Sequence, residues 1–186
     1  MFIIEVVTEK INDLAFHAYG CRVIQRILEH STQDKTQPMI NKLMKNCLQC
    51  CQCQYGNYIM QHLLEKGPQK EKDQLLTQLQ PNFVRLSMNK FASNVTEKSV
   101  LHGSMDFKRG VKDVLLNTFH ENKLGLVALM NHPYGNYVVQ RLFENSDDQV
   151  RLDIYKATQG EHAEELKKNN HGKHVMGFIE KFMEKK

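Results

Sequence analysis

The sequence predicts an all-α protein in which similar helical units stack one on another as a solenoid. A seven-residue pattern recurs along the chain, and the intervals between its first residues are 36, 36, 43 and 37 residues. A repeat of this length is typical of solenoids built from short helices. Apolar residues inside the strong copies also recur three and four residues apart, which is helical spacing. The five copies begin at Tyr19, Tyr55, Phe91, Tyr134 and His171.

The strong copies are each predicted to form a helix with one buried stripe, the central helix of its unit. In the second copy, the pair Ile59-Met60 is followed one turn later by Leu63-Leu64, so the four side chains share a face. The first and fourth copies have the same arrangement, in Val23-Ile24 with Ile27-Leu28 and in Val138-Val139 with Leu142-Phe143.

Three positions in each copy lie off this stripe, on the opposite face of the central helix. They are the third, fourth and seventh residues of the pattern, and side chains four residues apart lie one above the other. A three-residue signature therefore recurs on one predicted surface, once per unit. The four sets are Cys21, Arg22 and Gln25; Asn57, Tyr58 and Gln61; Ser93, Asn94 and Glu97; and Asn136, Tyr137 and Gln140.

The segments YGCRVIQRILEH, YGNYIMQHLLE, NKFASNV and YGNYVVQ occur in this order, and with them the chain resembles the Pumilio (PUF) family of single-stranded RNA-binding proteins. The resemblance covers nearly the whole chain, from about Phe2 to the end. The longer third interval also matches an insertion that the family has before its last base-reading repeat. The resemblance implies a right-handed α-solenoid of three-helix repeats. It corresponds to the C-terminal half of a Pumilio-type domain, with the last four base-reading repeats and a C-terminal cap.

Residues 1–186 are accordingly predicted to form a single repeat domain. Each repeat should contain a short helix, a central helix and an outer helix, with Pro38, Gly67 and Pro68 ending one helix and starting the next. Residues 1–16 should form the opening helix, helical spacing should continue to Phe119, and residues 120–125 should form a loop. The repeats are expected at about 2–38, 39–74, 75–117 and 118–154, followed by a cap at 155–186.

The two ends of the chain carry different expectations. The opening helix is apolar over more than one face, and such a helix normally has neighbours on two sides. Either Phe2, Ile3, Val6 and Val7 present an uncovered packing face, or they fold back to close this end of the array. The fifth copy has Gly177 in place of the final Gln or Glu, so it lacks a base-reading side chain. Its polar outer end, with Lys181, Lys185 and Lys186, is typical of a cap.

Composition and charge fit a soluble protein of the cytoplasm. The formal charge of +4 at pH 7 permits an anionic partner without identifying one. No apolar run approaches the roughly 18 residues that span a bilayer, so no membrane partner is expected. The first seven residues lack the basic start of a signal peptide.

Four cysteines within seven residues, Cys47, Cys50, Cys51 and Cys53, have two interpretations. Zinc needs well-separated ligand pairs to close a tetrahedron. Alignment of the repeats instead places Cys47 and Cys50 at positions where other copies have apolar residues, and a buried free cysteine behaves as a small hydrophobe. Core packing is therefore favoured over a metal site, and so many unpaired thiols indicate a reducing compartment. No catalytic frame or phosphate-binding loop occurs, so neither an enzyme nor a cofactor is expected. A thiol- or metal-dependent enzyme remains an alternative only because of this cluster.

The signature has the chemistry that reading single-stranded bases requires, namely planar groups for stacking and polar groups that bind base edges. Arg22, Tyr58, Asn94 and Tyr137 are the expected stacking residues. Glu97, beside Ser93, has a carboxylate that only accepts hydrogen bonds, which suits the two adjacent donors of guanine.

The amide-bearing sets suit other bases. Asn57 with Gln61, and Asn136 with Gln140, offer donors and acceptors for the alternating edge of uracil. Cys21 with Gln25 offers one amide for adenine, with the small thiol packed on the ring. The resemblance implies the same assignments, together with the family's own rule of one base per repeat and an RNA strand antiparallel to the protein. The expected core is 5′-UGUA-3′, read in turn by the sets of Asn136, Ser93, Asn57 and Cys21.

A basic or titratable residue follows each signature, namely Arg26, His62, Lys98 and Arg141. These side chains could line a phosphate backbone. Alternatively they form pairs inside their own helices, because Glu29, Glu65 and Glu144 lie three residues beyond three of them. Both interpretations remain open.

The expected function is sequence-specific binding of messenger RNA that contains UGUA in its 3′ untranslated regions. The resemblance implies post-transcriptional regulation by repression, with mRNA-repression or deadenylation effector proteins as further partners. The alternative is a solenoid that binds only proteins and has lost RNA binding by truncation.

Overall fold

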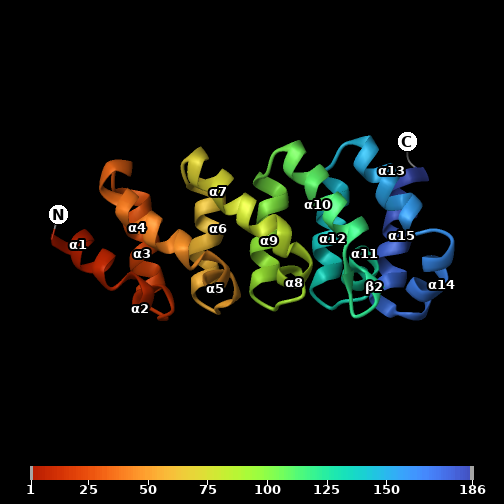
Figure 1. Ribbon diagram of the computed structural model, residues 1–186, viewed down its shortest axis with the longest axis horizontal. Helices are drawn as coiled ribbons and strands as arrows, with labels where there is room; N and C mark the ends of the chain where they lie inside the picture. The colour runs from red at the N-terminus through yellow and green to blue at the C-terminus, as the bar shows by residue number, and fades with distance from the viewer. Residues whose placement is uncertain (1, 185–186) are drawn as a thin grey trace. The chain divides into compact units, whose positions relative to one another are not determined.

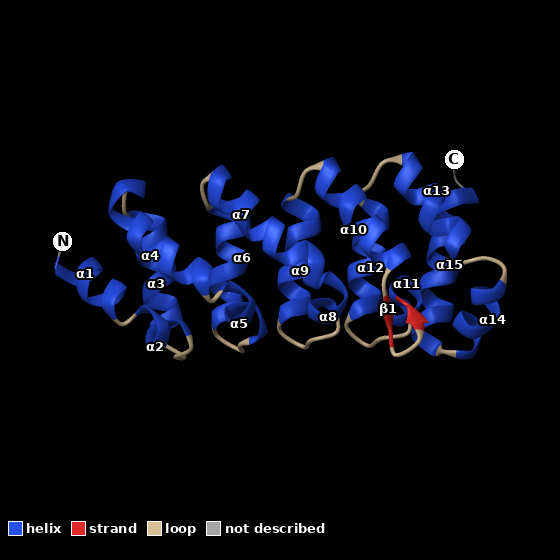
Figure 2. Cartoon of the chain, in the orientation of Figure 1, coloured by secondary structure: helices blue, strands red, loops and turns tan. Residues whose placement is uncertain are grey.

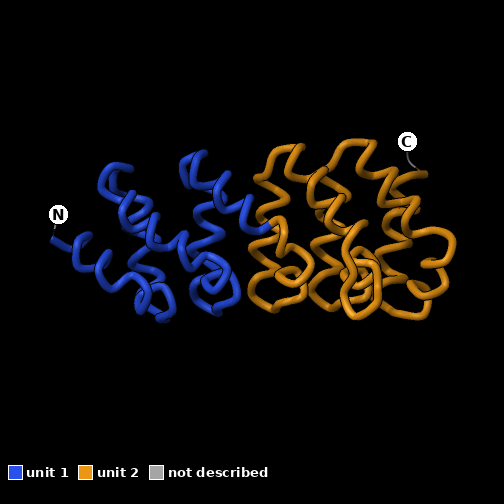
Figure 3. The backbone as a smooth tube through the Cα atoms, viewed as in Figure 1, with its two compact units in different colours: residues 1–79 blue, residues 80–186 orange. Residues whose placement is uncertain are grey.

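The structure is a computed structural model that describes residues 2–184. Among these residues the elements are helices, apart from the two-residue strands β1 (Phe119–His120) and β2 (Lys123–Leu124) (Figure 2). The fold is thus all-α, as predicted. The described chain divides into two compact units, with the boundary between Leu79 and Gln80 (Figure 3).

Unit 1 contains two three-helix repeats, preceded by α1 (Phe2–Glu9). The central helices α3 and α6 pack against each other, and α1, α4 and α7 form a row of outer helices. In Figure 1 the outer helices α4 and α7 lie along one edge of this unit, and the short helices α2 and α5 along the other. The repeats comprise α2 (Ile11–Ala15), α3 (Gly20–His30) and α4 (Gln33–Lys45), then α5 (Cys47–Gln52), α6 (Gly56–Lys66) and α7 (Gln69–Leu79).

Unit 2 begins with the 3-10 helix η1 (Gln80–Asn82) and repeats the same design, in which the central helices α9, α12 and α15 pack in a row. The short helices α8, α11 and α14 form a second row, and the outer helices α10 and α13 pack together. The elements are α8 (Phe83–Ser87), α9 (Ala92–His102), α10 (Met105–Asn117), α11 (Gly125–Met130), α12 (Gly135–Glu144), α13 (Asp148–Ala157), α14 (Glu161–Lys168) and α15 (Asn170–Glu184).

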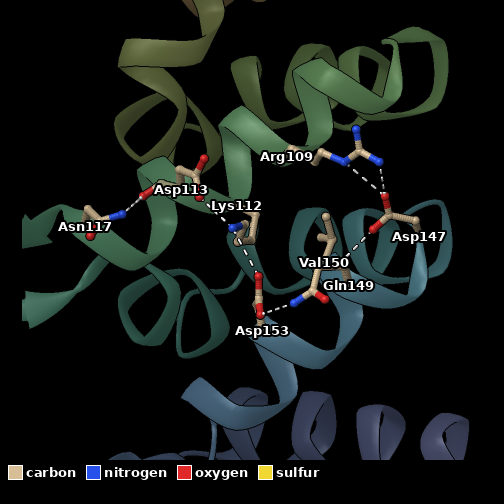
Figure 4. Close-up of polar contacts among 8 residues, drawn as sticks. All are labelled: Arg109, Lys112, Asp113, Asn117, Asp147, Gln149, Val150 and Asp153. Carbon is tan, nitrogen blue, oxygen red and sulfur yellow. Dashed lines mark hydrogen bonds and ion pairs between the residues drawn. The ribbon is translucent and has the colours of Figure 1, made fainter.

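Charged side chains connect the two outer helices of unit 2. Arg109 of α10 donates from Nε and Nη2 to Asp147 Oδ2, at 3.1 and 2.8 Å, and Lys112 Nζ lies 3.2 Å from Asp153 Oδ2 (Figure 4). Asp147 also accepts from the Val150 backbone N–H at 2.9 Å, which satisfies a free donor at the start of α13. The Asp147 carboxylate therefore caps the start of α13 and also attaches α13 to α10.

The central helices end against basic side chains of the outer helices. Arg151 of α13 donates from Nε to Phe143 O at 2.9 Å and from Nη2 to Glu144 O at 2.8 Å. In unit 1, Lys72 Nζ of α7 donates to Glu65 O at 3.2 Å. These bonds satisfy carbonyls that the last turn of a helix leaves free, and they place positive charge at the negative end of the helix dipole.

The buried stripe of the central helices is as predicted in α6 and α12, where Ile59, Met60, Val138 and Val139 are all buried. In α3, by contrast, Val23 is 44% exposed and Ile27 and Leu28 are only half-buried. The central helix α12 has central helices on both sides, α9 and α15, whereas within unit 1 α3 packs on one central helix, α6.

Several element predictions were wrong in detail. The opening helix is two helices, separated at Lys10, because α1 packs on the outer helix α4 while α2 is the short helix of the first repeat. Pro38 lies inside α4, where it removes a single backbone bond near the helix start and its neighbours Met39 and Ile40 are buried.

The segment predicted as a loop after α10 is instead a tight hairpin. β1 and β2 pair antiparallel, and the two residues of the turn, Glu121 and Asn122, have positive φ angles of 49° and 63°. Two positive φ angles are typical of a two-residue hairpin turn. Phe119 lies in β1 and is exposed, so the helical spacing predicted to reach it ends with Asn117.

Cysteine packing agrees with the core interpretation. Cys47, Cys50 and Cys51 are buried, and burial raises the pKa of Cys47 to about 11 and that of Cys50 to about 12. Cys47 donates to Gln78 Oε1 at 3.0 Å. Within residues 2–184, no three His, Cys, Asp or Glu side chains gather in a way that could hold a metal ion.

The C-terminal helix α15 packs on α12 through aromatic contacts. Phe143 of α12 meets Phe178 and Phe182 of α15 edge to face, with ring centroids 6.2 and 5.4 Å apart. The predicted start of the cap at residue 155 falls inside α13, and Lys185 and Lys186 lie outside the described residues. In the described part of the chain, no helix is long and apolar enough to cross a membrane.

Candidate nucleic-acid interface

The three signature positions differ in exposure, although all were predicted to lie on the surface. The first position is recessed: Asn57 and Asn136 are each only 2% exposed, and Cys21 and Ser93 are also buried. The second position projects into solvent, and Tyr137 is 62% exposed. The third, occupied by Gln or Glu, is half-buried. Each set therefore offers one projecting group beside a recessed polar pair.

Bonds to the preceding turn hold the first position in place. Asn57 Nδ2 donates to Cys53 O at 2.8 Å, and Asn136 Nδ2 donates to His132 O at 2.8 Å. Ser93 Oγ and the Cys21 thiol make longer contacts of the same kind, both at 3.4 Å. Burial raises the pKa of Cys21, so its thiol stays uncharged at neutral pH and serves as a packing surface.

The third position is anchored to the first in three of the sets. Gln61 Nε2 donates to Asn57 Oδ1 at 2.9 Å, and Gln140 Nε2 donates to Asn136 Oδ1 at 3.3 Å. Gln25 Nε2 donates to the backbone carbonyl of Cys21 at 3.1 Å. Gln25 and Gln61 each use one N–H for this bond and keep a carbonyl oxygen and a second N–H for a partner. Gln140 Nε2 also lies 3.3 Å from Asn136 O, so its amide nitrogen has two acceptors within its own helix.

Glu97 is held differently. Its Oε1 accepts from Arg141 Nε of the neighbouring central helix at 3.0 Å, and Arg141 Nη1 also donates to Glu144 at 3.0 Å. The Arg141 guanidinium thus bridges the Glu97 carboxylate of α9 and the Glu144 carboxylate of α12.

In unit 1, the two projecting residues of neighbouring helices face each other. The guanidinium carbon of Arg22 lies 5.2 Å from the centre of the Tyr58 ring, which is the geometry of a cation–π contact. Both side chains are exposed. Two planar groups are thus already paired where a flat ligand could stack.

The basic residues after the signatures are mostly engaged with carboxylates. Arg26 pairs with Glu29 in α3 and Arg141 with Glu144 in α12, as the intrahelical interpretation predicts. The His62 side chain is 11% exposed, 3.7 Å from Glu29, and burial lowers its pKa despite that carboxylate. His62 is therefore mainly neutral at pH 7 and a poor phosphate ligand. Lys98 is half-buried.

Sequence reasoning missed the residues that fix the start of each central helix. Two positions before the aromatic residue, His132 Nδ1 accepts from the backbone N–H of Tyr134 at 3.2 Å and of Gly135 at 3.3 Å. A residue that can accept hydrogen bonds recurs two positions before the first residue of every copy of the pattern, and this recurrence could have identified these residues. The equivalent acceptors are His17, Cys53, Asn89 and Asn169.

The repeats also match a known family. The model of the Pumilio-family RNA-binding repeat matches residues 10–44, 46–79, 82–113 and 126–157, which together make up more than half of the chain. Pumilio homology domain family member 4 of Saccharomyces cerevisiae is 30% identical over 186 residues, which cover 96% of this chain and 20% of that protein.

Solved structures agree in fold. PUF-8, in complex with PBE-RNA, superposes with a TM-score of 0.89 at 29% identity, over 98% of this chain and 53% of that one. Puf4, bound to a 3′ UTR recognition sequence of HO endonuclease RNA, gives 0.79 at 26% identity, over 95% and 55%.

The chain thus spans about half the length of these solved domains and a smaller part of the yeast relative. Its fold class is the α-solenoid of three-helix repeats that these domains share. A family of RNA-binding repeats has a binding function rather than an enzymatic one. The four matched repeats and the agreement in fold show that this chain belongs to the Pumilio family of RNA-binding repeat proteins.

Proposed function

We propose that this chain binds single-stranded RNA sequence-specifically and reads the core 5′-UGUA-3′, one base per repeat. The observation that carries the proposal is the recurrence of one arrangement in four central helices. A projecting side chain, Arg22, Tyr58, Asn94 or Tyr137, stands beside a recessed polar or thiol group and a half-buried amide or carboxylate. Stacking on the first and edge contacts with the other two are the interactions that single-stranded bases require.

The projecting residues supply the stacking. A base that enters between Arg22 and Tyr58 replaces their cation–π contact with contacts to both of its faces. Stacking on an aromatic side chain contributes about 1–3 kcal/mol per base. Tyr137 projects freely enough to stack a base from unit 2.

The recessed groups supply the discrimination. Gln140 Nε2 contacts both Asn136 O and Asn136 Oδ1, so a uracil at this repeat takes over one of these contacts when it binds. Gln61 uses one N–H for its bond to Asn57 and keeps a donor and an acceptor, which match the alternating edge of uracil. Gln25, beside the uncharged Cys21 thiol, has the same capacity and suits adenine where the small thiol leaves room for a purine. Glu97 with Ser93 accepts both donors of guanine.

The strand is proposed to run antiparallel to the chain, so that the sets of Asn136, Ser93, Asn57 and Cys21 read U, G, U and A. The targets are proposed to be messenger RNAs, in their 3′ untranslated regions, with post-transcriptional repression in the cytoplasm through effector proteins as the outcome. The relative bound to a 3′ UTR sequence supports this choice of target.

A selection from a random RNA library tests the proposal. The full chain is immobilised, and bound RNAs are recovered over several rounds and sequenced. Enrichment of UGUA is the expected result. Recovery of no common motif, or of a motif with a different base order, contradicts the proposed assignment, and failure to retain RNA at all favours a solenoid that binds only proteins.

A further inference from the structure

Glu97 lacks the internal anchor that holds the three glutamines at the same position of the signature. Those glutamines donate to a residue four positions earlier in their own helix. A carboxylate cannot donate. The nearby Ser93 hydroxyl donates to Lys90 O at 3.4 Å, and so does not serve as the missing anchor.

Arg141 supplies a donor from the neighbouring helix instead. Its Nε lies 3.0 Å from Glu97 Oε1, and its Nη1 lies 3.0 Å from Glu144 Oε2. The guanidinium is planar, so a bond to Glu144 on one nitrogen fixes the direction of the Nε–H that points to Glu97. The ion pair with Arg141 leaves Glu97 Oε2 and the second lone pair of Oε1 available to accept hydrogen bonds from a ligand.

We infer that Arg141 is a positioning residue for guanine selection, which holds the Glu97 carboxylate in the orientation that accepts the two donors of guanine. This inference rests on the proposed function and deepens it, because it assigns Arg141 to base discrimination rather than to phosphate binding. Arg141 acts on the base indirectly, by orienting Glu97. Because Arg141 belongs to α12, the helix proposed to read the first base, it connects that helix to the recognition of the second base.

The two roles of Arg141 predict different measurements. Loss of a phosphate contact weakens the binding of all RNAs alike. It also reduces the slope of log affinity against log salt concentration by about one. Loss of a positioning contact instead lowers the preference for guanine. Because the pair is partly exposed, the expected fall in that preference is about 1.4-fold to fivefold, the range that exposed ion pairs span.

The experiment measures equilibrium affinities of the full chain for two short RNAs that differ only in UGUA and UAUA, at several salt concentrations. Arg141→Met removes the donors and keeps the length of the side chain. Arg141→Lys keeps the positive charge but lacks the planar set of N–H groups, so it separates the effect of charge from that of orientation. Arg26→Met is the matched control, because Arg26 occupies the same position in the first repeat and pairs with Glu29 of its own helix.

Three results are expected together. Arg141→Met weakens UGUA more than UAUA, Arg141→Lys retains only part of the preference, and Arg26→Met leaves the ratio of the two affinities unchanged. In a Glu97→Gln background, Arg141→Met should lower the guanine preference no further. Melting temperatures of the variants, measured in parallel, should not follow the loss of preference.

Other outcomes overturn the inference. An equal loss of affinity for both RNAs assigns Arg141 to phosphate alone, and a gain in guanine preference shows that Arg141 competes with the base for Glu97. If wild type itself does not prefer UGUA, the proposed function fails, and this inference with it. A wild-type preference that Arg141→Met leaves intact defeats the inference alone.

Discussion

Glu97 differs from the glutamines at its position in two linked properties, its negative charge and its lack of a hydrogen-bond donor. Exchange for glutamine keeps the length and shape of the side chain and adds that donor. The altered pair, Ser93 with a glutamine, then resembles the pair of Cys21 with Gln25 that is proposed to read adenine. The chemistry of this single position is therefore proposed to decide the second base of the core.

Glu97→Gln should move the preference at that base from guanine to adenine. Guanine then faces a mismatched donor, and a mispaired bond in a desolvated site costs about 1–3 kcal/mol. Affinities for UGUA and UAUA, measured by fluorescence anisotropy, provide the test, and preferences at the other three bases serve as the control. An equal loss for both RNAs, or retained preference for guanine, assigns the second base to a different residue.

His132 is a second residue with a testable role, because it must be neutral at Nδ1 to accept from Tyr134 and Gly135. Burial lowers its pKa below the usual value of 6.5, and the neighbouring His171 and His120 lower it further. In the pH range below 6.5 the unfolded chain therefore binds more protons at this residue than the folded chain. The stability that neutral His132 contributes is present above pH 6.5 and is lost as the pH falls through the folded-state pKa.

His132→Asn should weaken this pH dependence. Asparagine accepts the same two bonds without titrating, as Asn89 does at the equivalent position before α9. Melting temperatures of wild type and variant are compared at pH 7.5 and 5.5, and the drop on acidification should be smaller in the variant. An identical drop in both proteins assigns the acid sensitivity to other groups, such as His62, whose pKa is also lowered by burial.

The residue types of the signature could be predicted from the sequence, whereas their exposure could not. Periodicity places Asn57 and Asn136 off the buried stripe, yet both are recessed, because their amides bond to carbonyls of the preceding turn. Likewise, nothing in the pattern shows that Arg141 contacts a residue 44 positions earlier. Such contacts depend on how neighbouring helices pack.

At the start of α12, a glycine allows the central helix to approach the short helix α11. A Cβ at Gly135 would lie 2.9 Å from Leu129 O and 3.1 Å from Leu129 Cα, which are backbone atoms that cannot move independently. Gly56 is in a similar position against Cys50. In the third repeat this position is Ala92, so the spacing there accommodates a methyl group.

Gly135→Ala should therefore destabilise unit 2 by about 1–3 kcal/mol, the usual cost of overpacking. Gly177→Ala is the matched control, since a Cβ there meets nothing within 4 Å, and within helix α15 it should stabilise by about 0.5–1 kcal/mol. Chemical denaturation of the two variants tests both signs. A Gly135→Ala protein as stable as wild type shows that the two helices can separate without cost.

Helices with a clear apolar stripe, such as α6 and α12, could be predicted from spacing alone. The break at Lys10 could not, because α1 and α2 both carry apolar residues and both pack on α4, and α2 in addition packs on the central helix α3. The hairpin at 119–124 was missed for another reason. Two residues per strand are too few for a periodic signal, and neither residue of the turn is a glycine.

The N-terminal helix presents apolar side chains that nothing in the described chain covers. Phe2 is 76% exposed, and Ile3 and Val6 are exposed as well, whereas Val7 is buried. This arrangement corresponds to the uncovered packing face rather than to the fold-back. Val23 of α3 is exposed in the same unit. Exposed apolar side chains of this kind promote association.

Phe2→Glu together with Ile3→Lys should reduce self-association of the protein at raised concentration. Sedimentation velocity over a range of concentrations measures this, with Glu9→Lys as a control that changes an exposed charge on the same helix. RNA affinity should remain unchanged, because α1 carries none of the signature residues. A wild type that stays monomeric at high concentration contradicts the expectation.

Recognition of guanine at the second base is the central claim about the whole molecule, and a direct titration tests it. Wild-type protein is titrated with two RNAs that differ only in UGUA and UCUA, at one salt concentration. Cytosine offers one donor, its N4 amino group, beside acceptors, whereas guanine offers two adjacent donors. With cytosine Glu97 loses a hydrogen bond, so it should reject this base by about 1–3 kcal/mol, which is roughly a fivefold to 150-fold difference in Kd. Tighter binding of UGUA within that range is the predicted result, and equal affinity for the two RNAs would contradict the account.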